Sequence, residues 1–475
     1  MTEPLIQRFE QAGQGHVFAF WDELPEDDRA SLLEQASEID LEEVATLHRT
    51  LVAGSDGDHQ DYSNLEPAPY IPHPDNGGNA GQWSEARNVG ESALRSGSVA
   101  AFVVAGGQGT RLGYDKPKGL YPVTPIHQKS LFQVFAEKIR GAENTYETTI
   151  PWFIMTSHVN YQDTVDFFEA NNFFGLKQEQ VHFFRQGRMP AIDTDGKILL
   201  SSKSSIAMSP DGHGGSLRAL VRSGATQIME DNDIDVLSYF QVDNPLIKVI
   251  DPAFIGFHLQ SQSGMSSKMI PKAYAAEKVG VFCNQNDKTV VIEYSDLPDE
   301  QTQATDEEGN LKFLSGSIAI HMLSRDFINQ MGGAGDDEDA PSLPFHRANK
   351  KIPTIDAAGN PVKPDEPNGI KFEMFVFDAL PFSEKTVVIE TQRSSDFSPV
   401  KNAEGLDSPQ TCKEDQMKEF ASWLAGVGVT VPTDENGVPL QSIEVSPLFG
   451  YDAPSFAASW NQLAEKPDLS QAIDL

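Results

Sequence analysis

Short apolar runs alternate with helical patterns through the middle of the chain. Residues 98–105 form a continuous apolar run that ends in glycines, which is typical of a strand buried on both faces of a parallel sheet. Further strand-like runs occupy residues 149–156, 181–184 and 236–242, and helical patterns occupy residues 131–139 and 164–171. This alternation predicts an α/β domain whose central sheet is mostly parallel.

The two ends of the chain show different patterns. Residues 5–54 carry apolar side chains at near-helical spacing, and residues 55–81 are rich in Pro, Gly, Asp and Asn, which indicates a connection. The strand-like runs 386–390 and 443–445 flank a helical pattern at 414–424, and the glycine-rich, acidic stretch 332–340 is expected to be a solvated loop. We therefore expect three consecutive regions in the 475 residues: a helical region with a linker (1–97), a main α/β domain (98–384) and a small C-terminal α+β domain (385–475).

The charge and the cysteine content argue against several classes of binding partner and site. The formal net charge of −34 argues against a general nucleic-acid or anionic-membrane binder, because either would need a broad basic face. A chain this acidic can attract a phosphate-bearing substrate only through a local cationic pocket. The two cysteines, Cys283 and Cys412, exclude a disulfide scaffold and a zinc site built from cysteine pairs. We expect a cytoplasmic protein, since the start of the chain lacks a signal-peptide pattern and no stretch approaches ~20 apolar residues.

A glycine-rich loop directly follows the first buried run. It reads Ala105-Gly106-Gly107-Gln108-Gly109-Thr110-Arg111-Leu112-Gly113, and Lys116-Pro117-Lys118 comes shortly after it. The loop lacks the Gly-Lys-Ser/Thr of a Walker loop, which disfavours a kinase, and Leu112 replaces the third glycine of a dinucleotide fingerprint. Glycines let backbone N–H groups approach phosphate oxygens, and the neighbouring Arg and Lys side chains supply cations. We interpret the loop as a phosphate site; the alternative is a tight strand-to-helix turn with basic surface residues.

The loop and its strand resemble the signature segment of sugar-nucleotide pyrophosphorylases, most closely that of eukaryotic-type UDP-N-acetylglucosamine pyrophosphorylases. Similar segments occur in order along nearly the whole chain, at residues 16–21, 151–157, 171–174, 186 with 190–191, 210–215, 241–244, 251–256, 279–281, 293–295, 367–371, 375–378, 397–402 and 444–448. The resemblance implies a Rossmann-like nucleotidyltransferase fold of glycosyltransferase-A-like type. It also implies that UTP and a sugar 1-phosphate give a UDP-sugar and pyrophosphate, by in-line attack of the sugar phosphate on the α-phosphorus.

The resemblance also assigns phosphate and nucleotide contacts to particular residues. The phosphates would be held by Arg111, Lys118 and Lys401. The nucleotide would be held by Ala105, Gly106, Gly107, Gln186, Gly212, His213 and Asp243. An amide such as that of Gln186 can pair with both a donor and an acceptor on uracil. Asp243 follows a buried strand, at the place where open α/β sheets bind ligands, and would hold Mg²⁺.

For the sugar, the resemblance implies contacts from Gly280, Glu293 and Ser317. Phe375 and Phe377 could form a wall of the N-acetyl pocket, although aromatic residues at this spacing on one strand face are also typical of a core. Two positions depart from the N-acetylglucosamine group, which has asparagine where this chain has His213 and an asparagine that contacts the sugar where this chain has Ser317.

These departures leave alternatives for the substrate and the function. N-acetylglucosamine 1-phosphate is the leading substrate, and glucose or galactose 1-phosphate, or a broad range of sugars, is the alternative. A non-catalytic regulator that binds a UDP-sugar is a further alternative, which the retained Arg111, Lys118, Asp243 and Lys401 disfavour. We expect a monomer or weak oligomer without nucleic-acid or membrane partners.

Overall fold

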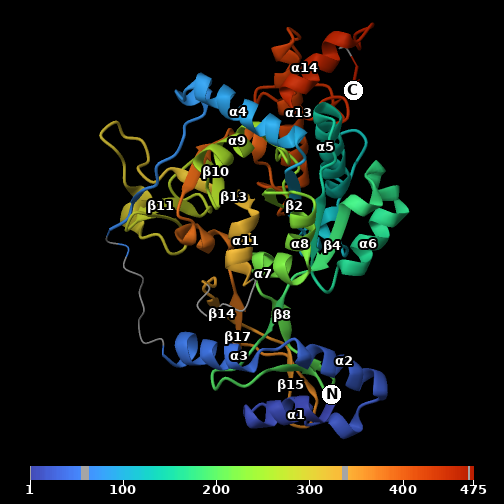
Figure 1. The fold of residues 1–475 in the computed structure, drawn as a ribbon, viewed down its shortest axis with the longest axis vertical. Coiled ribbons are helices and arrows are strands. Elements are labelled where there is room, and N and C mark those ends of the chain that lie inside the picture. Colours follow the sequence, from blue (N-terminus) through green and yellow to red (C-terminus); the bar gives the residue numbers. More distant parts are fainter. Residues whose placement is uncertain (1, 55–61, 63, 334–340, 469–470) are drawn as a thin grey trace. The chain divides into compact units, whose positions relative to one another are not determined.

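The structure is a computed structural model that describes residues 2–54, 62, 64–333, 341–468 and 471–475 (Figure 1). The expected solvated loop at 332–340 therefore lies almost wholly outside the described residues. Among the described residues, no helix is long and apolar enough to cross a bilayer.

Four parallel strands form the core of the central sheet. They are β9 (Val236–Gln241), β2 (Val99–Val104), β3 (Trp152–Thr156) and β4 (Val181–Arg185), adjacent in that order. Nearly every residue of β2, β3 and β9 is buried, as their continuous apolar runs require. The predicted α/β class, with a sheet that is mostly parallel in its core, is confirmed.

Antiparallel pairings extend the sheet beyond β9. The long strand β13 (Ser315–Ser324) pairs antiparallel with both β9 and β10 (Met265–Pro271). The remaining strands of this sheet are β1 (Glu66–Pro67), β11 (Val281–Gln285), β12 (Lys288–Ile292) and β18 (Thr386–Glu390). Since β18 pairs in parallel with β10, the run at 386–390 belongs to the central sheet rather than to a separate C-terminal domain.

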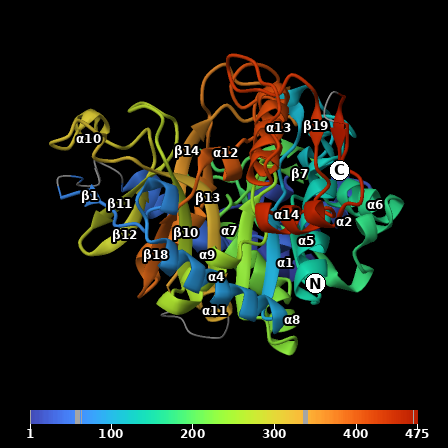
Figure 2. The ribbon, with the colours of Figure 1, turned by 90° about the horizontal axis from the view of Figure 1, so that it is seen from above.

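Helices cover the central sheet. They are α4 (Ala80–Arg95), α5 (Leu131–Tyr146), α6 (Tyr161–Ala170), α7 (Gly215–Arg222), α8 (Ala225–Asp231), α9 (Pro252–Ser261), α10 (Asp299–Gln303), α11 (Arg325–Gly332), α12 (Arg393–Asp396), α13 (Pro409–Gly426) and α14 (Ala453–Gln462). Figure 2 shows α4 and α9 lying side by side. Phe135 of α5 packs edge-on against Phe240 of β9 at 5.1 Å, which fixes that helix over the parallel strands.

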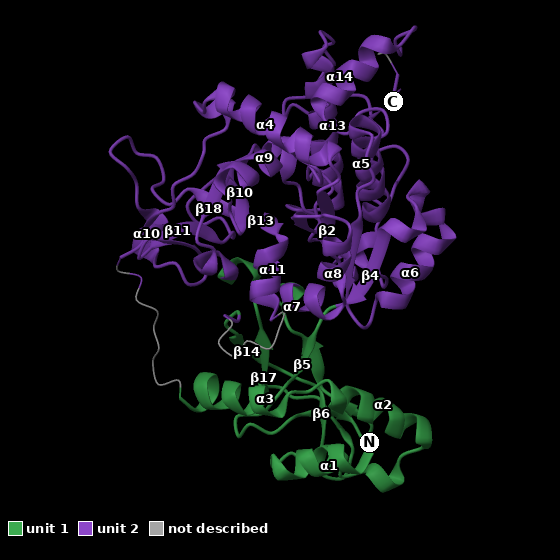
Figure 3. Ribbon diagram, in the orientation of Figure 1, with its two compact units in different colours: residues 1–61, 186–216, 343–378 green, residues 62–185, 217–342, 379–475 purple. Residues whose placement is uncertain are grey.

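The chain divides into two compact units (Figure 3). The first unit comprises residues 1–61, 186–216 and 343–378, and the second comprises 62–185, 217–342 and 379–475. The units are thus built from separated segments, whereas the sequence pattern led us to expect three consecutive regions. The second unit contains the whole central sheet, the C-terminal helices α13 and α14, and the short pair β19 (Ile443–Glu444) and β20 (Ile473–Asp474).

In the first unit, helices pack against small two-stranded sheets. The helices are α1 (Thr2–Gln11), α2 (Glu26–Ser37) and α3 (Leu41–Leu47), with the short turns η1 (Gly15–Phe18), η2 (Trp21–Glu23) and η3 (His48–Ala53). The strand pairs are β5 (Arg188–Pro190) with β8 (Met208–Pro210), β6 (Leu200–Ser202) with β7 (Ser205–Ile206), β14 (His346–Lys350) with β17 (Gly369–Glu373), and β15 (Thr354–Ile355) with β16 (Pro361–Val362).

Side chains of the N-terminal helical region fix the middle segment of the first unit. The Gln14 amide donates to the Gly196 carbonyl at 2.8 Å and accepts from the Ile198 amide at 3.0 Å. The Gln35 side chain accepts from the Ile206 amide at 3.0 Å. Helices at 5–54 are confirmed, and they support the segment that carries Gln186 and His213.

Candidate functional site

The glycine-rich loop leaves the carboxyl end of β2. Val104 pairs with Gln241 of β9, so the loop and the segment after β9 begin side by side at one edge of the sheet. The loop closes on itself, since the Gly109 amide donates to the Lys116 carbonyl at 3.0 Å and the Lys118 amide donates to the Gly107 carbonyl at 3.1 Å. A Cβ on Gly109 would lie 2.7 Å from the Tyr114 carbonyl oxygen, so this turn requires glycine.

Backbone donors in the loop remain available. Among the described residues, the N–H groups of Gly106 and Gly107 have no hydrogen-bond acceptor, and both residues are at least partly exposed. Unpaired backbone N–H groups in a glycine turn form a site that favours an anion. The interpretation of the loop as a phosphate site therefore has a geometric basis.

A buried asparagine holds the loop in place. The Asn160 amide nitrogen donates to the Ala105 carbonyl at 3.0 Å and to the Gly107 carbonyl at 3.3 Å. Its amide oxygen accepts from the backbone N–H of Ser157 at 2.8 Å, and the side chain is fully buried. Sequence analysis missed Asn160, because an Asn just before a helix is usually a local cap and nothing local shows that it reaches another loop.

Lys118 and Asp243 form an ion pair at the same edge of the sheet. The Lys118 ammonium lies 3.3 Å from the Asp243 carboxylate, and their side chains are 15% and 16% exposed. Lys118 begins the short helix η6 (Lys118–Leu120), and Asp243 lies two residues beyond β9. A cation and a carboxylate, both partly shielded from water, are thus placed beside the free amides of the loop.

A cavity of about 150 Å³ opens next to Asp243. It is lined by Gln241, Asp243, Asn244, Ile247, Lys278, Val279, Gly280, Ser317, Ile318, Ala319, Ile320, Phe397, Pro399 and Lys401. Four residues predicted from separate parts of the sequence, Asp243, Gly280, Ser317 and Lys401, therefore line one cavity. We name it the Asp243 cavity.

The sugar candidates of the second unit lie close to one another. The Ser317 amide donates to the Gly280 carbonyl at 2.7 Å. A carboxylate oxygen of Glu293 would lie 3.5 Å from a Cβ at Gly280, so Glu293 is adjacent to that backbone.

The other two phosphate candidates are more exposed than Lys118. Arg111 is exposed in the turn η5 (Thr110–Leu112). The Lys401 ammonium lies over the ring of Phe397 and 3.8 Å from the Asp407 carboxylate.

A second asparagine that sequence analysis missed fastens the segment of Lys401. The Asn244 side chain donates to the Asp396 carbonyl at 2.6 Å and accepts from the Ser398 amide at 3.1 Å. The Val400 amide donates to the Asp243 carbonyl at 2.8 Å. The residue next to Asp243 therefore holds the segment that carries Lys401, although more than 150 positions separate them in the sequence.

In the first unit, Gln186 is fixed by the turn that contains Gly212. Its amide nitrogen donates to the Gly212 carbonyl at 3.0 Å, which leaves its carbonyl oxygen as an acceptor, and the residue is only 7% exposed. Gly212 has a φ of +84°, and a Cβ there would lie 2.3 Å from the Met374 carbonyl oxygen. Only glycine fits this close, left-handed turn.

His213 is held as a neutral imidazole. The Val376 amide donates to its Nδ1 at 3.1 Å, so the hydrogen of the neutral ring lies on Nε2. Burial and the nearby His346 lower the pKa of His213 to about 4. His213 therefore presents an N–H donor that stays uncharged at neutral pH.

Phe375 and Phe377 lie with His213. The Phe375 ring stacks on His213 at 5.4 Å and on His346 at 4.6 Å, and the Phe377 ring lies 5.8 Å from His213. The two phenylalanines do not share a strand face, because β17 ends at Glu373 and Phe377 belongs to the 3-10 helix η9 (Val376–Phe382). The structure brings Phe375, Phe377 and His213 together in the first unit, while Gly280, Glu293 and Ser317 lie in the second.

Asp243 is the candidate ligand for a metal ion at this site. Within the described residues, no group of three or more His, Cys, Asp or Glu side chains could hold a metal ion. Asp243 offers one carboxylate, which fits the habit of Mg²⁺ to combine one or two carboxylates with substrate phosphates and water. Cys283 and Cys412 are free and buried, and burial raises both thiol pKa values to about 12, which favours the protonated thiol over the thiolate at neutral pH.

Comparisons with known proteins agree on one family. Residues 81–410 match the profile of the family described as UTP–glucose-1-phosphate uridylyltransferase. The chain is similar to the UDP-N-acetylglucosamine pyrophosphorylase of Saccharomyces cerevisiae, with 35% identity over 94% of each protein. It is also similar to UDP-N-acetylhexosamine pyrophosphorylase-like protein 1 of Xenopus tropicalis, with 35% identity over 95% of this chain and 92% of the relative.

Solved structures show the same relationship. The UDP-N-acetylglucosamine pyrophosphorylase of Trypanosoma brucei, solved in complex with an inhibitor, superposes with a TM-score of 0.84 and 27% identity, covering 100% of this chain and 98% of its own. The UDP-glucose phosphorylase of the same organism superposes with a TM-score of 0.63 at 16% identity, covering 90% of this chain and 86% of its own, and shares the fold. The resemblance drawn from the sequence is confirmed, and the chain belongs to the family of UTP–sugar-1-phosphate uridylyltransferases, in the group of the UDP-N-acetylglucosamine pyrophosphorylases.

Proposed function

We propose that this protein converts UTP and N-acetylglucosamine 1-phosphate into UDP-N-acetylglucosamine and pyrophosphate. The main support is the Lys118–Asp243 ion pair, which lies beside the unpaired loop amides. Its Asp243 lines a cavity that is also lined by Lys401, Gly280 and Ser317. This arrangement supplies cations and backbone donors for phosphates and polar groups for a sugar.

In the proposed reaction, the protein positions two anions and stabilises the charge that develops on the transferring group. Lys118 and the Gly106 and Gly107 amides hold the triphosphate, with Arg111 on the departing pyrophosphate. Lys401 holds the phosphate of the sugar. When Mg²⁺ is bound, it neutralises phosphate oxygens, and Asp243 is the residue that would hold it.

Uridine recognition is assigned to Gln186 and His213. Uracil presents carbonyl acceptors and one N–H donor, and Gln186 keeps an acceptor oxygen while His213 keeps an N–H donor. Because His213 stays neutral, this pairing does not depend on protonation near neutral pH. We further propose that the protein works in the cytoplasm as a monomer or weak oligomer, which its free cysteines and acidic composition support.

A panel of sugar 1-phosphates tests the substrate. Release of pyrophosphate would be measured with UTP and N-acetylglucosamine, glucose or galactose 1-phosphate, each with and without Mg²⁺. We expect the highest kcat/KM with N-acetylglucosamine 1-phosphate and loss of activity without the metal. An equal or higher kcat/KM with glucose 1-phosphate would instead support the glucose alternative, for which the serine at 317 in place of asparagine leaves room.

A further inference from the structure

One lysine of the central sheet is enclosed by protein. Lys268 lies in β10 and is only 1% exposed, and it is among the largest fully buried side chains that the structure describes. Its ammonium lies 2.9 Å from the Asp396 carboxylate and 2.7 Å from the Asp251 carboxylate. Asp251 directly precedes α9, and Asp396 is the last residue of α12. Lys268 therefore joins β10 to two segments that are distant from it in the sequence.

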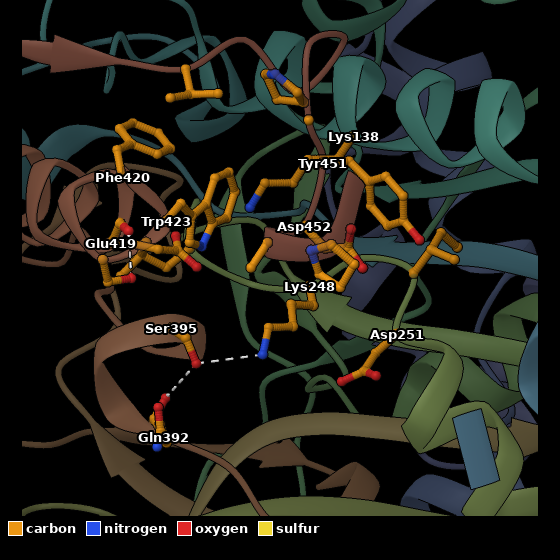
Figure 4. A pocket seen from close by; sticks show the side chains of 18 of the residues that line it. Lys138, Lys248, Asp251, Gln392, Ser395, Glu419, Phe420, Trp423, Tyr451 and Asp452 are labelled. Atoms are coloured by element: carbon orange, nitrogen blue, oxygen red, sulfur yellow. Dashed lines mark hydrogen bonds between the residues drawn. The ribbon is translucent and has the colours of Figure 1, made fainter. Parts of the chain in front are cut away.

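A second lysine balances the charge of this group. The Lys248 ammonium lies 3.7 Å from the Asp396 carboxylate. Figure 4 shows the Lys248 side chain reaching toward Ser395, the residue before Asp396, with Asp251 nearby. Two ammonium groups thus face two carboxylates, and the group is neutral as a whole. We name these four residues, Lys248, Asp251, Lys268 and Asp396, the Lys268 cluster.

Buried ion pairs such as those of the Lys268 cluster contribute little net stability. Taking charged groups out of water costs free energy that their mutual attraction only just repays, and apolar side chains of similar volume are often at least as stable in their place. Buried ionic groups can instead select one particular arrangement of the chain. The role of the Lys268 cluster is therefore to be sought in the segments that it joins.

The Lys268 cluster fixes the segment that carries Lys401. The Asp396 carboxylate accepts from the Lys248 backbone amide at 2.9 Å and from the Thr391 hydroxyl. The carbonyl of the same residue accepts from the Asn244 side chain at 2.6 Å. Asp396 is thus bonded to the segment after β9 through both its side chain and its backbone. The segment that follows Asp396 carries Lys401 on the wall of the Asp243 cavity.

Lys268 also lies beside the strand that carries Ser317. The residues on either side of Lys268 in β10 pair with Ser317 and His321 of β13, so Lys268 faces a bulge at residues 318–320. Ala319 in the bulge has a φ of +55°, in the left-handed region that residues other than glycine rarely adopt. All three bulge residues line the Asp243 cavity. A strained bulge persists only where its surroundings hold it, and Lys268 anchors the strand opposite.

The Lys268 cluster is therefore attached to three segments that line the Asp243 cavity, residues 241–247, 317–320 and 397–401. We propose that Lys268 is a positioning residue for uridylyl transfer, which holds these three segments in register through Asp396 and β10. This inference rests on the proposed function, which assigns the substrates to that cavity. Lys268 is too deeply buried to touch a substrate and acts only through the segments.

Two variants separate positioning from stability. Lys268→Met leaves two buried carboxylates with a single ammonium and should lower the urea midpoint of unfolding. Addition of Asp396→Asn makes the cluster neutral again and keeps an oxygen that can accept from the Lys248 amide. The double variant should therefore regain most of the lost stability, while the bond between β10 and the segment of Lys401 stays broken. If Lys268 served stability alone, kcat would return together with the urea midpoint.

We expect the double variant to remain defective in catalysis. Its kcat should be at least about tenfold below that of the wild-type protein, because a misplacement of about 1 Å can cost about 10²-fold. The Kd for UTP should change far less, since Gly106 and Gly107 belong to a loop that the Lys268 cluster does not contact. A wild-type kcat, or a loss of UTP affinity as large as the loss of kcat, would overturn the proposal.

Another buried ion pair provides a matched control. The Lys129 ammonium lies 2.7 Å from the Glu137 carboxylate, and the side chains are 14% and 8% exposed. Neither residue lines the Asp243 cavity. Lys129→Met with Glu137→Gln breaks a pair of the same kind and should leave kcat within about twofold, because it moves no segment of the cavity. An equal loss of kcat in this control would overturn the assignment to Lys268.

Amide hydrogen exchange measures the positions of the segments without an assay of activity. The Val400 amide, which donates to the Asp243 carbonyl at 2.8 Å, should exchange at least about tenfold faster in the double variant and at the wild-type rate in the control. Unchanged exchange at Val400 would overturn the proposal. Faster exchange in a protein whose wild-type form transfers uridylyl to no sugar 1-phosphate would refute the proposed function and retain the role of Lys268 in holding the segments.

Thr391→Val provides a milder change if the double variant fails to fold. Valine has nearly the shape of threonine, and the substitution removes only the hydroxyl that donates to Asp396. It should lower kcat about threefold, the scale of one hydrogen bond, and it should also accelerate exchange at Val400. Wild-type kcat and wild-type exchange in Thr391→Val would overturn the proposal.

Discussion

Lys118 offers the sharpest test of the proposed chemistry. Its side chain is 15% exposed and its ammonium lies 3.3 Å from the Asp243 carboxylate, so the charge acts where water screens it only partly. A unit charge about 4 Å from a phosphate oxygen is worth about 4 kcal/mol at the effective dielectric constant of about 20 that suits such sites. Loss of one transition-state donor costs about 2.7–4 kcal/mol, equivalent to roughly 10²–10³ in kcat. We therefore expect Lys118→Met to lower turnover at least about 10²-fold.

Pyrophosphate release under saturating UTP and sugar 1-phosphate measures this effect on kcat. Lys118→Arg keeps the charge and should retain more activity than Lys118→Met. Lys177→Met changes the net charge by the same amount on an exposed surface of the same unit, and it should leave kcat within about twofold, as a screened surface charge does. A Lys118→Met enzyme with wild-type kcat would refute the role of this cation, and an equal loss in Lys177→Met would attribute the effect to overall charge.

Three further substitutions test other parts of the site. Asn160→Ala should raise the KM for UTP roughly tenfold and lower the free energy of unfolding by about 1–3 kcal/mol, since the loop loses a buried hydrogen-bond donor. Unchanged kinetics and an unchanged urea unfolding curve would contradict this expectation. The pKa of His213 in the folded protein is about 4, below its ordinary value of 6.5. Below pH 6.5 the unfolded chain binds a proton that the folded protein does not bind. The free energy of unfolding therefore falls between pH 6.5 and pH 4, by at most about 3 kcal/mol, and is unaffected by this residue above pH 6.5. His213→Asn should therefore flatten the pH dependence of unfolding over this interval, and an unchanged slope would count against the shift. Ser317→Asn should raise the kcat/KM ratio of N-acetylglucosamine over glucose 1-phosphate about tenfold, and an unchanged ratio would exclude a sugar contact at this position.

Local patterns in the sequence predicted the parallel core well. The strands at 99–104, 152–156 and 236–241 lie within the predicted runs, because a strand covered on both faces must be apolar throughout. The strand at 181–185 extends one residue beyond its predicted run. The helix α4 was not predicted, since its sequence is largely polar and only a few of its residues are buried. The pairing of β18 with β10 could not be predicted either, because it joins segments more than 100 residues apart and leaves no local signal.

The sequence predicted those residues of the candidate site that lie in segments resembling the family. Residues within family-like segments, such as Lys118, Asp243, Gly280 and Lys401, could be named, and the structure places them around one ion pair and one cavity. Asn160 and Asn244 act through hydrogen bonds to distant backbone atoms, so their role depends on the folded arrangement. Their residue type alone is equally compatible with a helix cap or a turn.

The discontinuous make-up of the first unit has a consequence for biosynthesis. Residues 1–61 emerge early, but their partners at 186–216 and 343–378 come much later in the sequence. At a synthesis rate of about 5–20 residues per second, the last of these partners follows the first segment by on the order of 15–60 s. During that time buried side chains such as Phe9, Val17 and Leu32 have no complete core to cover them. The nascent chain therefore presents an early apolar surface that favours chaperone binding, and the first unit can complete its fold only after most of the second has been synthesised.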